Sequence, residues 1–364
     1  MGLTLGDLIG IWGQPCSSQK VNLTNPLGSV CTDTRLLSKG DFFIPLKGDN
    51  FNGHDFIFQS YSRGAQAAVI EKDFEMPLPD GLIYWRVQDT LKAFQQLALL
   101  HRRDLSIPVI AVTGSVGKTT TREFIREVLA PLGIINSSVD NQNNDIGVPL
   151  TLLKTKASNA AVVLEMGMRG LGEIKRLSCC SEPDIAVITN IGTAHIGRLG
   201  SRENIALAKT EITSSLKSSG VVVIPANDHL LENALSNNWK GRVIRVGIQD
   251  VSSSTINYPF SILNGIDVLG RVDFKKGVMQ VDNENFKLPL PGIHNAKNLI
   301  LAIAVAKEFG ISFGRMTSLD VQLPPGRSRI IKMGSITVLD ETYNSSPEAV
   351  KASLQLLSGF PGRH

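Results

Sequence analysis

The stretch that decides the fold is Pro108-Val109-Ile110-Ala111-Val112-Thr113-Gly114-Ser115-Val116-Gly117-Lys118-Thr119-Thr120-Thr121. Its first part is a run of β-branched and apolar residues ending at Thr113, which predicts a buried strand. Apolar residues then recur at helical spacing, so a helix is expected to open near Lys118. These are Phe124, Ile125, Val128 and Leu129. The sequence therefore predicts a strand, a turn and a helix in immediate succession.

The turn has the chemistry of a phosphate-binding loop. Gly114 and Gly117 let backbone N–H groups close on an anion, and the helix N-terminus adds partial positive charge. Lys118 can reach the outer phosphates of a nucleotide, and the Thr119 hydroxyl can ligate Mg²⁺. The general pattern G-x-x-x-x-G-K-[ST] is missed by one position, because its first glycine would fall at Val112; the shorter T-G-x-x-G-K-T-T stands here. The alternative is an ordinary glycine turn with a surface lysine, but the agreement of strand, turn and helix favours nucleotide binding.

Length and composition are those of a globular protein with room for two or three domains. The chain has 364 residues, 42% of them hydrophobic and 19% charged. The net charge of +4 is spread without a basic run, so a nucleic-acid surface has no compositional support. No two of the cysteines form a C-x-x-C motif. We therefore expect them to be reduced thiols in a cytoplasmic protein, and we expect no zinc site. They are Cys16, Cys31, Cys179 and Cys180. Without a basic start before a long apolar run, or any stretch near about 18 apolar residues, neither secretion nor a membrane span is expected.

Changes in pattern along the chain predict three domains. They are residues 1–104, 105–323 and 324–364. The first combines short strands with helices near Thr4–Trp12 and Thr90–Arg103, which indicates a small α/β domain. The last begins at Pro324-Pro325-Gly326 and holds only a strand, Ile336–Leu339, and a helix, Glu348–Leu357. One strand and one helix cannot bury a core, so it is expected to be the start of an incomplete α/β domain.

The middle domain is predicted to be a doubly wound, mostly parallel sheet of the P-loop type, because buried-looking strands alternate with helical segments. The expected strands are Val109–Thr113, Ala160–Glu165, Ile185–Asn190 and Val221–Ile224. Near Arg271–Leu290 the apolar period switches to two, with Lys276-Gly277 as a turn, which predicts an added hairpin. A helix is then expected to run to about Phe309.

Ligands of such a sheet bind at the carboxyl ends of its strands. Glu165 closes one expected strand, where a Mg²⁺ ligand is needed beside a P-loop; the alternative is a capping glutamate. His195 follows another strand, which favours a metal or phosphate contact over a structural histidine. Lys209, on an apolar helix stripe, is by itself a snorkelling surface lysine. Polar segments of the first domain are explained equally well by turns and caps as by a ligand. They are Thr32–Arg35, Gly40–Gly48 and Asn52–Phe56.

Eight signatures occur in order along the chain and resemble those of one enzyme family. They are Gly114–Thr120; Asn143–Leu153; Glu165-Met166-Gly167 with Gly172-Glu173-Ile174; Ala194-His195 with Gly200-Ser201; Ala208-Lys209 with Glu211-Ile212; His294-Asn295 with Asn298; Pro325-Gly326-Arg327; and Asp340 with Tyr343-Asn344. Together they resemble the Mur ligases, and most closely the branch that adds D-alanyl-D-alanine. The resemblance extends over essentially the whole chain.

The resemblance implies an N-terminal domain for a uridine nucleotide, a central ATPase domain, and a C-terminal domain that closes over the site. The residues implied for the UDP-sugar are Thr34, Arg35, Lys47 and His54. Those implied for ATP are Gly114, Ser115, Val116, Gly117, Lys118, Thr119, Thr120, Asn144, His294, Asn295, Asn298, Arg327 and Asp340. Two Mg²⁺ ions are implied, the first on Thr119 and Glu165, the second on His195 and a Lys209 carbamylated by CO₂. Those implied for catalysis are Lys118, Glu165, His195 and Lys209.

Three positions depart from the family pattern. Ile293 stands where an arginine is common before His-Asn, Gly197 where a glutamate often follows the histidine, and Thr210 where glycine often precedes Glu-Ile. They bear on residues around the ligands and leave the metal and phosphate ligands themselves in place.

The implied reaction is ATP-driven amide formation between UDP-N-acetylmuramoyl-tripeptide and D-alanyl-D-alanine through an acyl phosphate, in peptidoglycan precursor synthesis. A sister ligase that adds a diamino acid or glutamate, of the Mur or folylpolyglutamate type, is the nearer alternative. Tyr343-Asn344 after Asp340 and the context of Lys209 favour the first interpretation. A nucleotide-binding module that no longer ligates is the more distant one. No nucleic-acid partner is expected, and the protein is expected to be a monomer.

The chain reaches His364 when the third domain has only begun, and a typical domain would need roughly a hundred further residues. We therefore expect this chain to bind its nucleotides but to ligate poorly or not at all. The physical reason is that an incomplete third domain cannot exclude water from an acyl phosphate.

Overall fold

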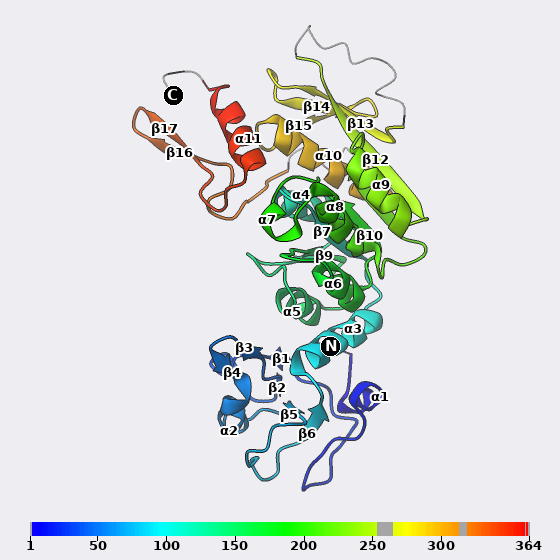
Figure 1. Ribbon diagram of the computed structural model, residues 1–364, viewed down its shortest axis with the longest axis vertical. Helices are drawn as coiled ribbons and strands as arrows, with labels where there is room; N and C mark the ends of the chain where they lie inside the picture. The colour runs from blue at the N-terminus through cyan, green and yellow to red at the C-terminus, as the bar shows by residue number, and fades with distance from the viewer. Residues whose placement is uncertain (1, 253–264, 313–318, 361, 363–364) are drawn as a thin grey trace. The chain divides into compact units, whose positions relative to one another are not determined.

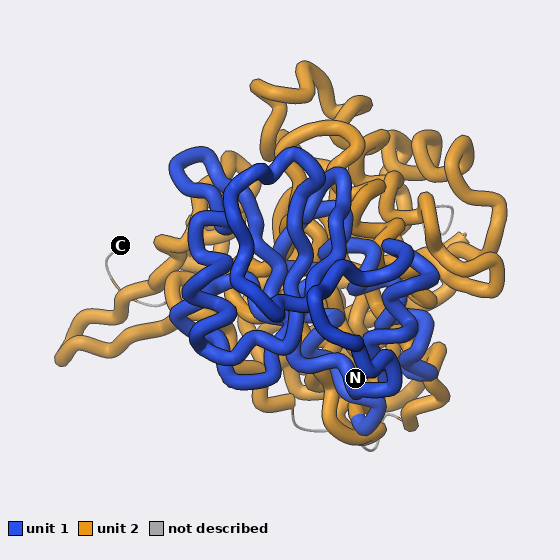
Figure 2. Tube along the Cα trace, turned by 90° about the horizontal axis from the view of Figure 1, so that it is seen from below, with its two compact units in different colours: residues 1–107, 145–158 blue, residues 108–144, 159–364 orange. Residues whose placement is uncertain are grey.

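The computed structural model describes residues 2–252, 265–312, 319–360 and 362. The chain divides into two compact units, residues 1–107 with 145–158 and residues 108–144 with 159–364 (Figure 2). Segment 145–158 thus belongs to the first unit, although in sequence it follows the phosphate-binding turn. Within the described ranges, no helix combines the length and the hydropathy needed to cross a bilayer.

The first unit is built on a parallel sheet (Figure 1). Its strands, in spatial order, are β1 (Val30–Cys31), β2 (Phe42–Phe43), β5 (Ala67–Glu71) and β6 (Tyr84–Val87). Its helices are η1 (Leu5–Leu8), α1 (Ile9–Trp12), η2 (Gly53–Phe56), α2 (Ile57–Ser62), α3 (Thr90–Asp104) and α5 (Gly147–Lys154). A short antiparallel hairpin pairs β3 (Lys47–Gly48) with β4 (Phe51–Asn52).

Aromatic and helical packing stabilise this unit. The Trp12 ring stacks on Phe42 with centroids 6.1 Å apart and meets Trp85 edge-on at 6.2 Å, in the geometries that aromatic pairs prefer. Helix α5 joins the unit by packing on α3, where His101 Nε2 donates to the Thr155 carbonyl at 2.9 Å. This contact gives a physical reason for grouping segment 145–158 with residues 1–107.

The second unit is organised by a nine-stranded sheet in the order β15-β14-β13-β12-β11-β10-β7-β9-β8. These strands are β7 (Val109–Thr113), β8 (Ile135–Ser137), β9 (Ala161–Glu165), β10 (Ile185–Ile188), β11 (Val221–Pro225), β12 (Arg242–Asp250), β13 (Val268–Asp273), β14 (Val278–Val281) and β15 (Glu284–Lys287). All pairings from β13 to β8 are parallel, and β14 and β15 add antiparallel strands. The predicted mostly parallel sheet and its added hairpin are confirmed, and β8, β12 and β15 are strands that the sequence did not predict.

Helices cover the sheet of the second unit. They are α4 (Lys118–Leu129), η3 (Ala130–Leu132), α6 (Glu173–Ser181), α7 (Ile196–Leu199), α8 (Arg202–Thr210), η4 (Glu211–Thr213), α9 (His229–Asn238) and α10 (Ile293–Glu308). Helices α4 and α10 pack on each other and share one apolar core with alternate residues of the strands, such as Ile110 and Val112. Every residue of β7 is buried, as expected for a parallel strand covered on both faces.

The last described segment forms a small α/β element. Strands β16 (Arg329–Met333) and β17 (Ile336–Asp340) pair as an antiparallel hairpin, and α11 (Pro347–Leu357) follows. The expected strand and helix are both present, and β16 is an additional strand. The Ser346 hydroxyl caps α11 by accepting the Ala349 N–H at 3.2 Å.

Candidate active site

The turn between β7 and α4 leaves room only for glycine at two positions. Gly114 has a φ of 151° and Gly117 a φ of 82°. A Cβ on Gly114 would lie 1.8 Å from Thr189 Oγ1, and one on Gly117 would lie 2.6 Å from Asn298 Oδ1. Backbone conformation and close approach thus both require glycine here, as in a loop whose N–H groups line an anion site.

The loop after β10 holds this turn in shape. The Asn190 carbonyl accepts the Ser115 N–H at 3.1 Å, and its side chain accepts the Val116 N–H at 3.2 Å and donates to the Val116 carbonyl at 2.9 Å. Ser115 Oγ in turn accepts the Gly192 N–H at 2.9 Å. The sequence placed Asn190 at the end of an expected strand but gave it no role. The available signal was an amide side chain directly after the strand that neighbours β7.

Lys118 and Arg327 bring two positive charges to the turn. Lys118 Nζ donates to the Gly114 carbonyl at 3.0 Å. Burial lowers the pKa of the Lys118 amino group, Glu165 opposes that shift, and the charge of Arg327 adds to it. Arg327 therefore acts electrostatically on Lys118 from a distant segment, and its guanidinium lies 3.8 Å from the Tyr343 ring centroid. This positive environment suits a polyphosphate.

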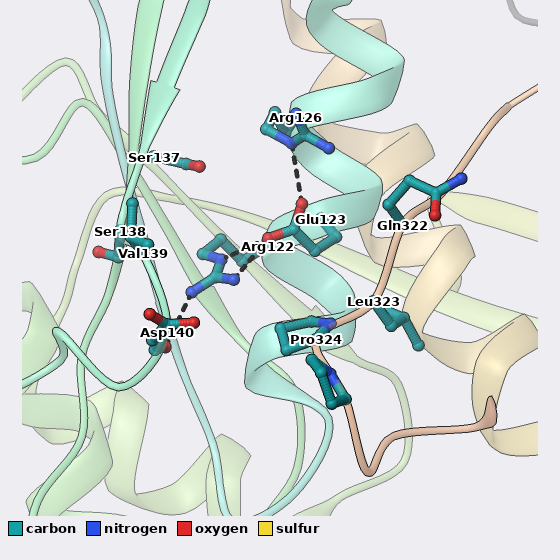
Figure 3. A pocket seen from close by; sticks show the side chains of 11 residues that line it. Arg122, Glu123, Arg126, Ser137, Ser138, Val139, Asp140, Gln322, Leu323 and Pro324 are labelled. Atoms are coloured by element: carbon teal, nitrogen blue, oxygen red, sulfur yellow. Dashed lines mark hydrogen bonds and ion pairs between the residues drawn. The ribbon is translucent and has the colours of Figure 1, made fainter. Parts of the chain in front are cut away.

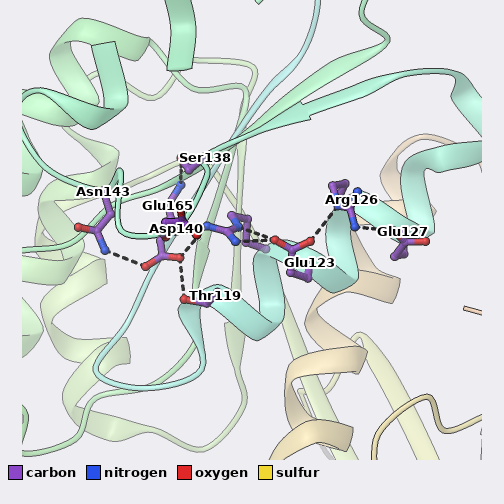
Figure 4. A network of polar contacts seen from close by, with 9 residues as sticks. Thr119, Glu123, Arg126, Glu127, Ser138, Asp140, Asn143 and Glu165 are labelled. Carbon is purple, nitrogen blue, oxygen red and sulfur yellow. Dashed lines mark hydrogen bonds and ion pairs between the residues drawn. The ribbon is translucent and has the colours of Figure 1, made fainter. Parts of the chain in front are cut away.

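Glu165 ends β9, whose pairing with β7 sets it beside the turn. Its carboxylate is only 2% exposed and is held by two neutral donors (Figure 4). Oε2 accepts the Thr119 hydroxyl at 2.9 Å, and Oε1 accepts the Asn143 amide at 2.9 Å. The backbone N–H of Glu165 donates to Ser138 Oγ at 3.1 Å. The predicted neighbours Thr119 and Glu165 thus lie in contact, and sequence reasoning missed Asn143 and Ser138 as their partners.

The charge of Lys118 acts on both His195 and Lys209. His195 precedes α7 with a φ of 68°, which is unusual for a residue with a side chain. Lys209 lies on α8 and is 2% exposed, although its sequence context alone suggested a surface lysine. Burial and the charge of Lys118 hold the pKa of the Lys209 amino group well below its ordinary value. Burial, Lys209 and Lys118 together lower the pKa of His195.

The residues predicted to line the nucleotide on α10 have different surroundings. Asn298 packs against Gly117, as described above, whereas Asn295 is 2% exposed and donates to the Pro291 carbonyl at 2.8 Å. His294 is partly buried, and this burial lowers the pKa of its ring against an opposing effect of Glu341. Asn298 thus meets the phosphate-binding turn directly, and Asn295 holds the loop that precedes α10.

Asn144 and Asp340 lie at less enclosed positions. Asn144 is exposed and follows Asn143, which reaches Glu165. Asp340 ends β17 and accepts the Thr342 hydroxyl and N–H at 2.7 and 3.2 Å, and these bonds lower the pKa of its carboxyl. Asp340 is thus held as an ionised acceptor.

In the first unit, the Thr34-Arg35 turn is held by neighbours. Thr34 donates to Gln59 Oε1 at 2.7 Å, and Arg63 donates to the Thr34 carbonyl at 2.7 Å. The Arg35 side chain is 85% exposed and pairs with Asp33, whose pKa it lowers to about 2. The turn therefore presents an exposed guanidinium on a well-supported backbone.

Lys47 and His54 meet at Glu71 within the first unit. Lys47 forms an ion pair with the Glu71 carboxylate. His54 is 1% exposed, with Nδ1 at 2.9 Å from Asn52 Oδ1 and Nε2 accepting the Glu71 N–H at 3.1 Å. Both ring nitrogens are engaged, and burial lowers the pKa of the ring. In this arrangement Lys47 has the exposed charge, and His54 supports the backbone behind it.

Replacing Gly114 with alanine tests whether the shape of the turn matters. The Gly114→Ala variant is expected to displace the turn, because its Cβ would overlap Thr189 Oγ1, at a cost of about 2 kcal/mol or more. Calorimetry should show at least tenfold weaker nucleotide binding. Gly10→Ala is the control, because a Cβ there meets nothing within 4 Å. Equal nucleotide affinity in the two variants would contradict a role for this turn.

The chemistry of the site is that of an anion site next to a hard-cation site. Among the described residues, no three His, Cys, Asp or Glu side chains gather as a metal cluster. A cation here would instead meet the Thr119 hydroxyl and the Glu165 carboxylate, oxygen donors of the kind that Mg²⁺ prefers. The sheet topology brings these donors to the same edge as Lys118.

Comparisons with known proteins identify the same family over both units. A family model described as "Mur ligase middle domain" matches residues 112–306, and one described as "Mur ligase family, catalytic domain" matches residues 27–102. The UDP-N-acetylmuramoyl-tripeptide--D-alanyl-D-alanine ligase of Synechocystis sp. is 39% identical over 354 residues, which are 96% of this chain and 74% of that protein.

Solved structures agree with these matches. MurF from Acinetobacter baumannii superposes with a TM-score of 0.82 at 29% identity, covering 99% of this chain and 77% of that one. MurF ligase from Thermotoga maritima, solved in complex with ADP, gives a TM-score of 0.78 at 26% identity, covering 92% of this chain and 76% of that one. Because the middle-domain match spans more than half of the residues and the Synechocystis relative is matched over most of its length, the chain belongs to the Mur ligase family.

Proposed function

We propose that this protein is an ATP-dependent ligase that joins D-alanyl-D-alanine to UDP-N-acetylmuramoyl-tripeptide in peptidoglycan precursor synthesis. The observation that carries the proposal is the contact between Thr119 and the buried Glu165 beside Lys118. It sets donors for a cation next to a loop suited to phosphate, at one edge of the sheet. The substrates are those in the name of the Synechocystis relative.

The residues present fit ATP and Mg²⁺. The Thr119 hydroxyl donates a hydrogen bond to Glu165, which leaves oxygen lone pairs on both groups for a cation. Mg²⁺, when bound, neutralises charge on the phosphates. We assign the first ion to Thr119 and Glu165, and a second to His195 and a carbamate on Lys209. Lys118 and Arg327 are proposed to hold phosphates, and Asp340 the ribose. The proposed nucleotide wall consists of Asn144, His294, Asn295 and Asn298.

The carbamate is supported by the surroundings of Lys209. The side chain is 2% exposed, and the charged group acting on it is another cation, Lys118. A buried ammonium without a counter-charge is costly, so a neutral amine is favoured. The neutral nitrogen bonds to the carbon of CO₂ and releases one proton, and the resulting anion can ligate a cation. Carbamate formation thus replaces a neutral amine by an anion at this position.

The chain's residues would act on two bond changes. In the first, the tripeptide's terminal carboxylate attacks the γ-phosphorus of ATP and ADP leaves, while Lys118 holds the phosphate oxygens as charge redistributes. In the second, the dipeptide amine attacks the acyl carbon and loses a proton, and the tetrahedral intermediate collapses to the amide as inorganic phosphate leaves. Water must be excluded while the acyl phosphate exists, which gives closure of the C-terminal segment its role.

The first unit is proposed to bind the UDP-sugar. Thr34, Arg35 and Lys47 present polar groups from supported positions, and His54 supports Lys47 through Glu71. We further propose three domains, residues 1–104, 105–323 and 324–364. We propose in addition that the protein is a monomer and cytoplasmic, and its four free cysteines are compatible with a reducing compartment.

The test is acceptor-dependent phosphate release. With UDP-N-acetylmuramoyl-tripeptide and ATP present, D-alanyl-D-alanine is expected to stimulate phosphate release and yield the pentapeptide product, detected by mass spectrometry. Diaminopimelate and glutamate are the matched acceptors, each offered with the UDP-linked precursor its ligase uses. Stimulation by one of them alone would replace this proposal with a sister ligase. Binding of nucleotide with no product from any acceptor would favour a non-ligating module.

A further inference from the structure

Arg122 is a buried charge that the proposed function leaves unused. It lies on α4 one turn after Thr119, and its side chain is almost completely buried, with the whole residue 1% exposed. A buried guanidinium is costly unless acceptors surround it. Here its Nε donates to Glu123 Oε1 at 3.0 Å, and its Nη1 lies 3.4 Å from the Asp140 carbonyl (Figure 3). The same Nη1 lies 3.3 Å from Glu165 Oε2.

Arg122 is the only cation in contact with Glu165 among the described residues. Thr119 and Arg122 approach the same oxygen, Oε2, whereas Asn143 approaches Oε1. Thr119 and Asn143 are neutral donors, so the charged hydrogen bond from Arg122 is the one that restrains the ionised carboxylate most strongly. Its removal would leave rotation of the carboxylate opposed by neutral contacts alone.

Glu123 keeps Arg122 from cancelling the charge of Glu165. Glu123 is 6% exposed, bonds Arg122 through Oε1 and accepts Arg126 Nε at Oε2, 2.8 Å away. The charges therefore alternate from Glu165 through Arg122 and Glu123 to Arg126. Because Glu123 shares the positive charge of Arg122, Glu165 is held in place and still retains negative charge for a cation.

We propose that Arg122, with Glu123, is a positioning residue that orients the Glu165 carboxylate for Mg²⁺ and so sets the affinity of the site for the metal. The proposal rests on the metal-binding role given to Glu165 in the proposed function. It assigns a purpose to the pair of charges that follows the Gly-Lys-Thr-Thr turn.

A cavity beside Arg122 and Glu123 allows the proposal to be tested by chemical rescue of a variant that lacks the Arg122 side chain. It has a volume of about 330 Å³, and its lining includes Arg122, Glu123, Asp140 and the prolines of segment 322–325 (Figure 3). Truncation of Arg122 would enlarge this space next to Glu123. A free guanidinium ion could then enter and take the place of the lost side chain.

The principal variant is Arg122→Met combined with Glu123→Gln, which removes both charges and leaves neither unpaired. Its matched control is Arg245→Met combined with Glu232→Gln, because this ion pair joins β12 to α9 in the same unit and contacts neither Glu165 nor the Arg122–Glu123 pair. Nucleotide binding is measured by calorimetry across a Mg²⁺ titration and in EDTA, and Mn²⁺ binding is measured directly by electron paramagnetic resonance. Thermal denaturation records the stability of each variant.

The principal variant is expected to need roughly tenfold or more Mg²⁺ for the same nucleotide affinity, with binding in EDTA unchanged. The control should keep the wild-type Mg²⁺ dependence even if its stability falls. In Arg122→Ala, guanidinium well below denaturing concentrations should restore the Mg²⁺ dependence, and urea should not. Equal shifts in both double variants, or none in the principal one, would overturn the proposal. Metal-independent nucleotide binding by the wild-type protein would instead contradict the proposed function itself.

Discussion

Lys118→Ala is expected to weaken Mg-nucleotide binding by roughly 100-fold or more and to abolish phosphate release. The Lys118 amino group is directed into the turn, where its Nζ lies 3.0 Å from the Gly114 carbonyl. Without the Lys118 ammonium, the negatively charged outer phosphates would face the Glu165 carboxylate in a partly dehydrated site. Of the two cations described at this turn, only Arg327 would remain to offset that negative charge. Calorimetry with a non-hydrolysable ATP analogue and a phosphate-release assay give the two measurements.

Two further variants sharpen this test. Lys118→Arg keeps the positive charge but replaces the compact ammonium by a planar guanidinium. We therefore expect nucleotide affinity to fall by a smaller factor than the rate of phosphoryl transfer. Lys240→Ala removes an exposed lysine of the same unit and should behave as wild type. If Lys118→Ala binds Mg-nucleotide normally and still releases phosphate, the turn does not bind phosphate.

Lys209→Ala is expected to reduce ligation by about 100-fold or more, because the position would lose the anion proposed to hold a second cation. Small carboxylates such as formate or acetate should partly restore activity, since the lost side chain leaves space in a buried position. Lys209→Arg should not be active, because a guanidinium stays positive and forms no carbamate.

A spectroscopic measurement separates the carbamate from a merely structural lysine. Wild-type protein supplied with ¹³C-bicarbonate should show a carbamate carbon resonance that is absent from Lys209→Ala and retained in Lys175→Ala, whose lysine is exposed on α6. Activity should fall when CO₂ is removed and return when bicarbonate is added. Wild-type ligation by Lys209→Ala would refute the proposal.

Local sequence determined the elements that depend on neighbouring residues. The β-branched run predicted β7, and the helix opens at Lys118 as expected, because strand propensity, glycine conformations and helical spacing all act within a few residues. The edge shared by the turn, Glu165 and the loop before His195 also followed from sequence, because carboxyl ends of adjacent parallel strands meet.

Grouping of segments was decided by tertiary contacts. Segment 145–158 follows the phosphate-binding turn in sequence, yet helix α5 packs on α3, and His101 reaches Thr155. Strand β16 pairs with β17 although its own pattern was not recognised. The grouping of segment 145–158 depends on a partner distant in sequence, whereas β16 pairs with the strand that follows it directly in the chain.

The surroundings of the charged groups were what the sequence predicted least well. Arg122-Glu123 and Arg126-Glu127 repeat at helical spacing and look alike in sequence, but only the first pair is buried against Glu165. The sequence context of Lys209 predicted a surface lysine, but the structure buries it. His54 was expected to contact the substrate, but both of its ring nitrogens are engaged by neighbouring groups of the protein. Sequence alone therefore predicted strands β7, β9, β10 and β11 and the turn that follows β7. Only the tertiary structure decided which charges lose water and which partners they gain, because desolvation and pairing are set by segments far apart in the chain.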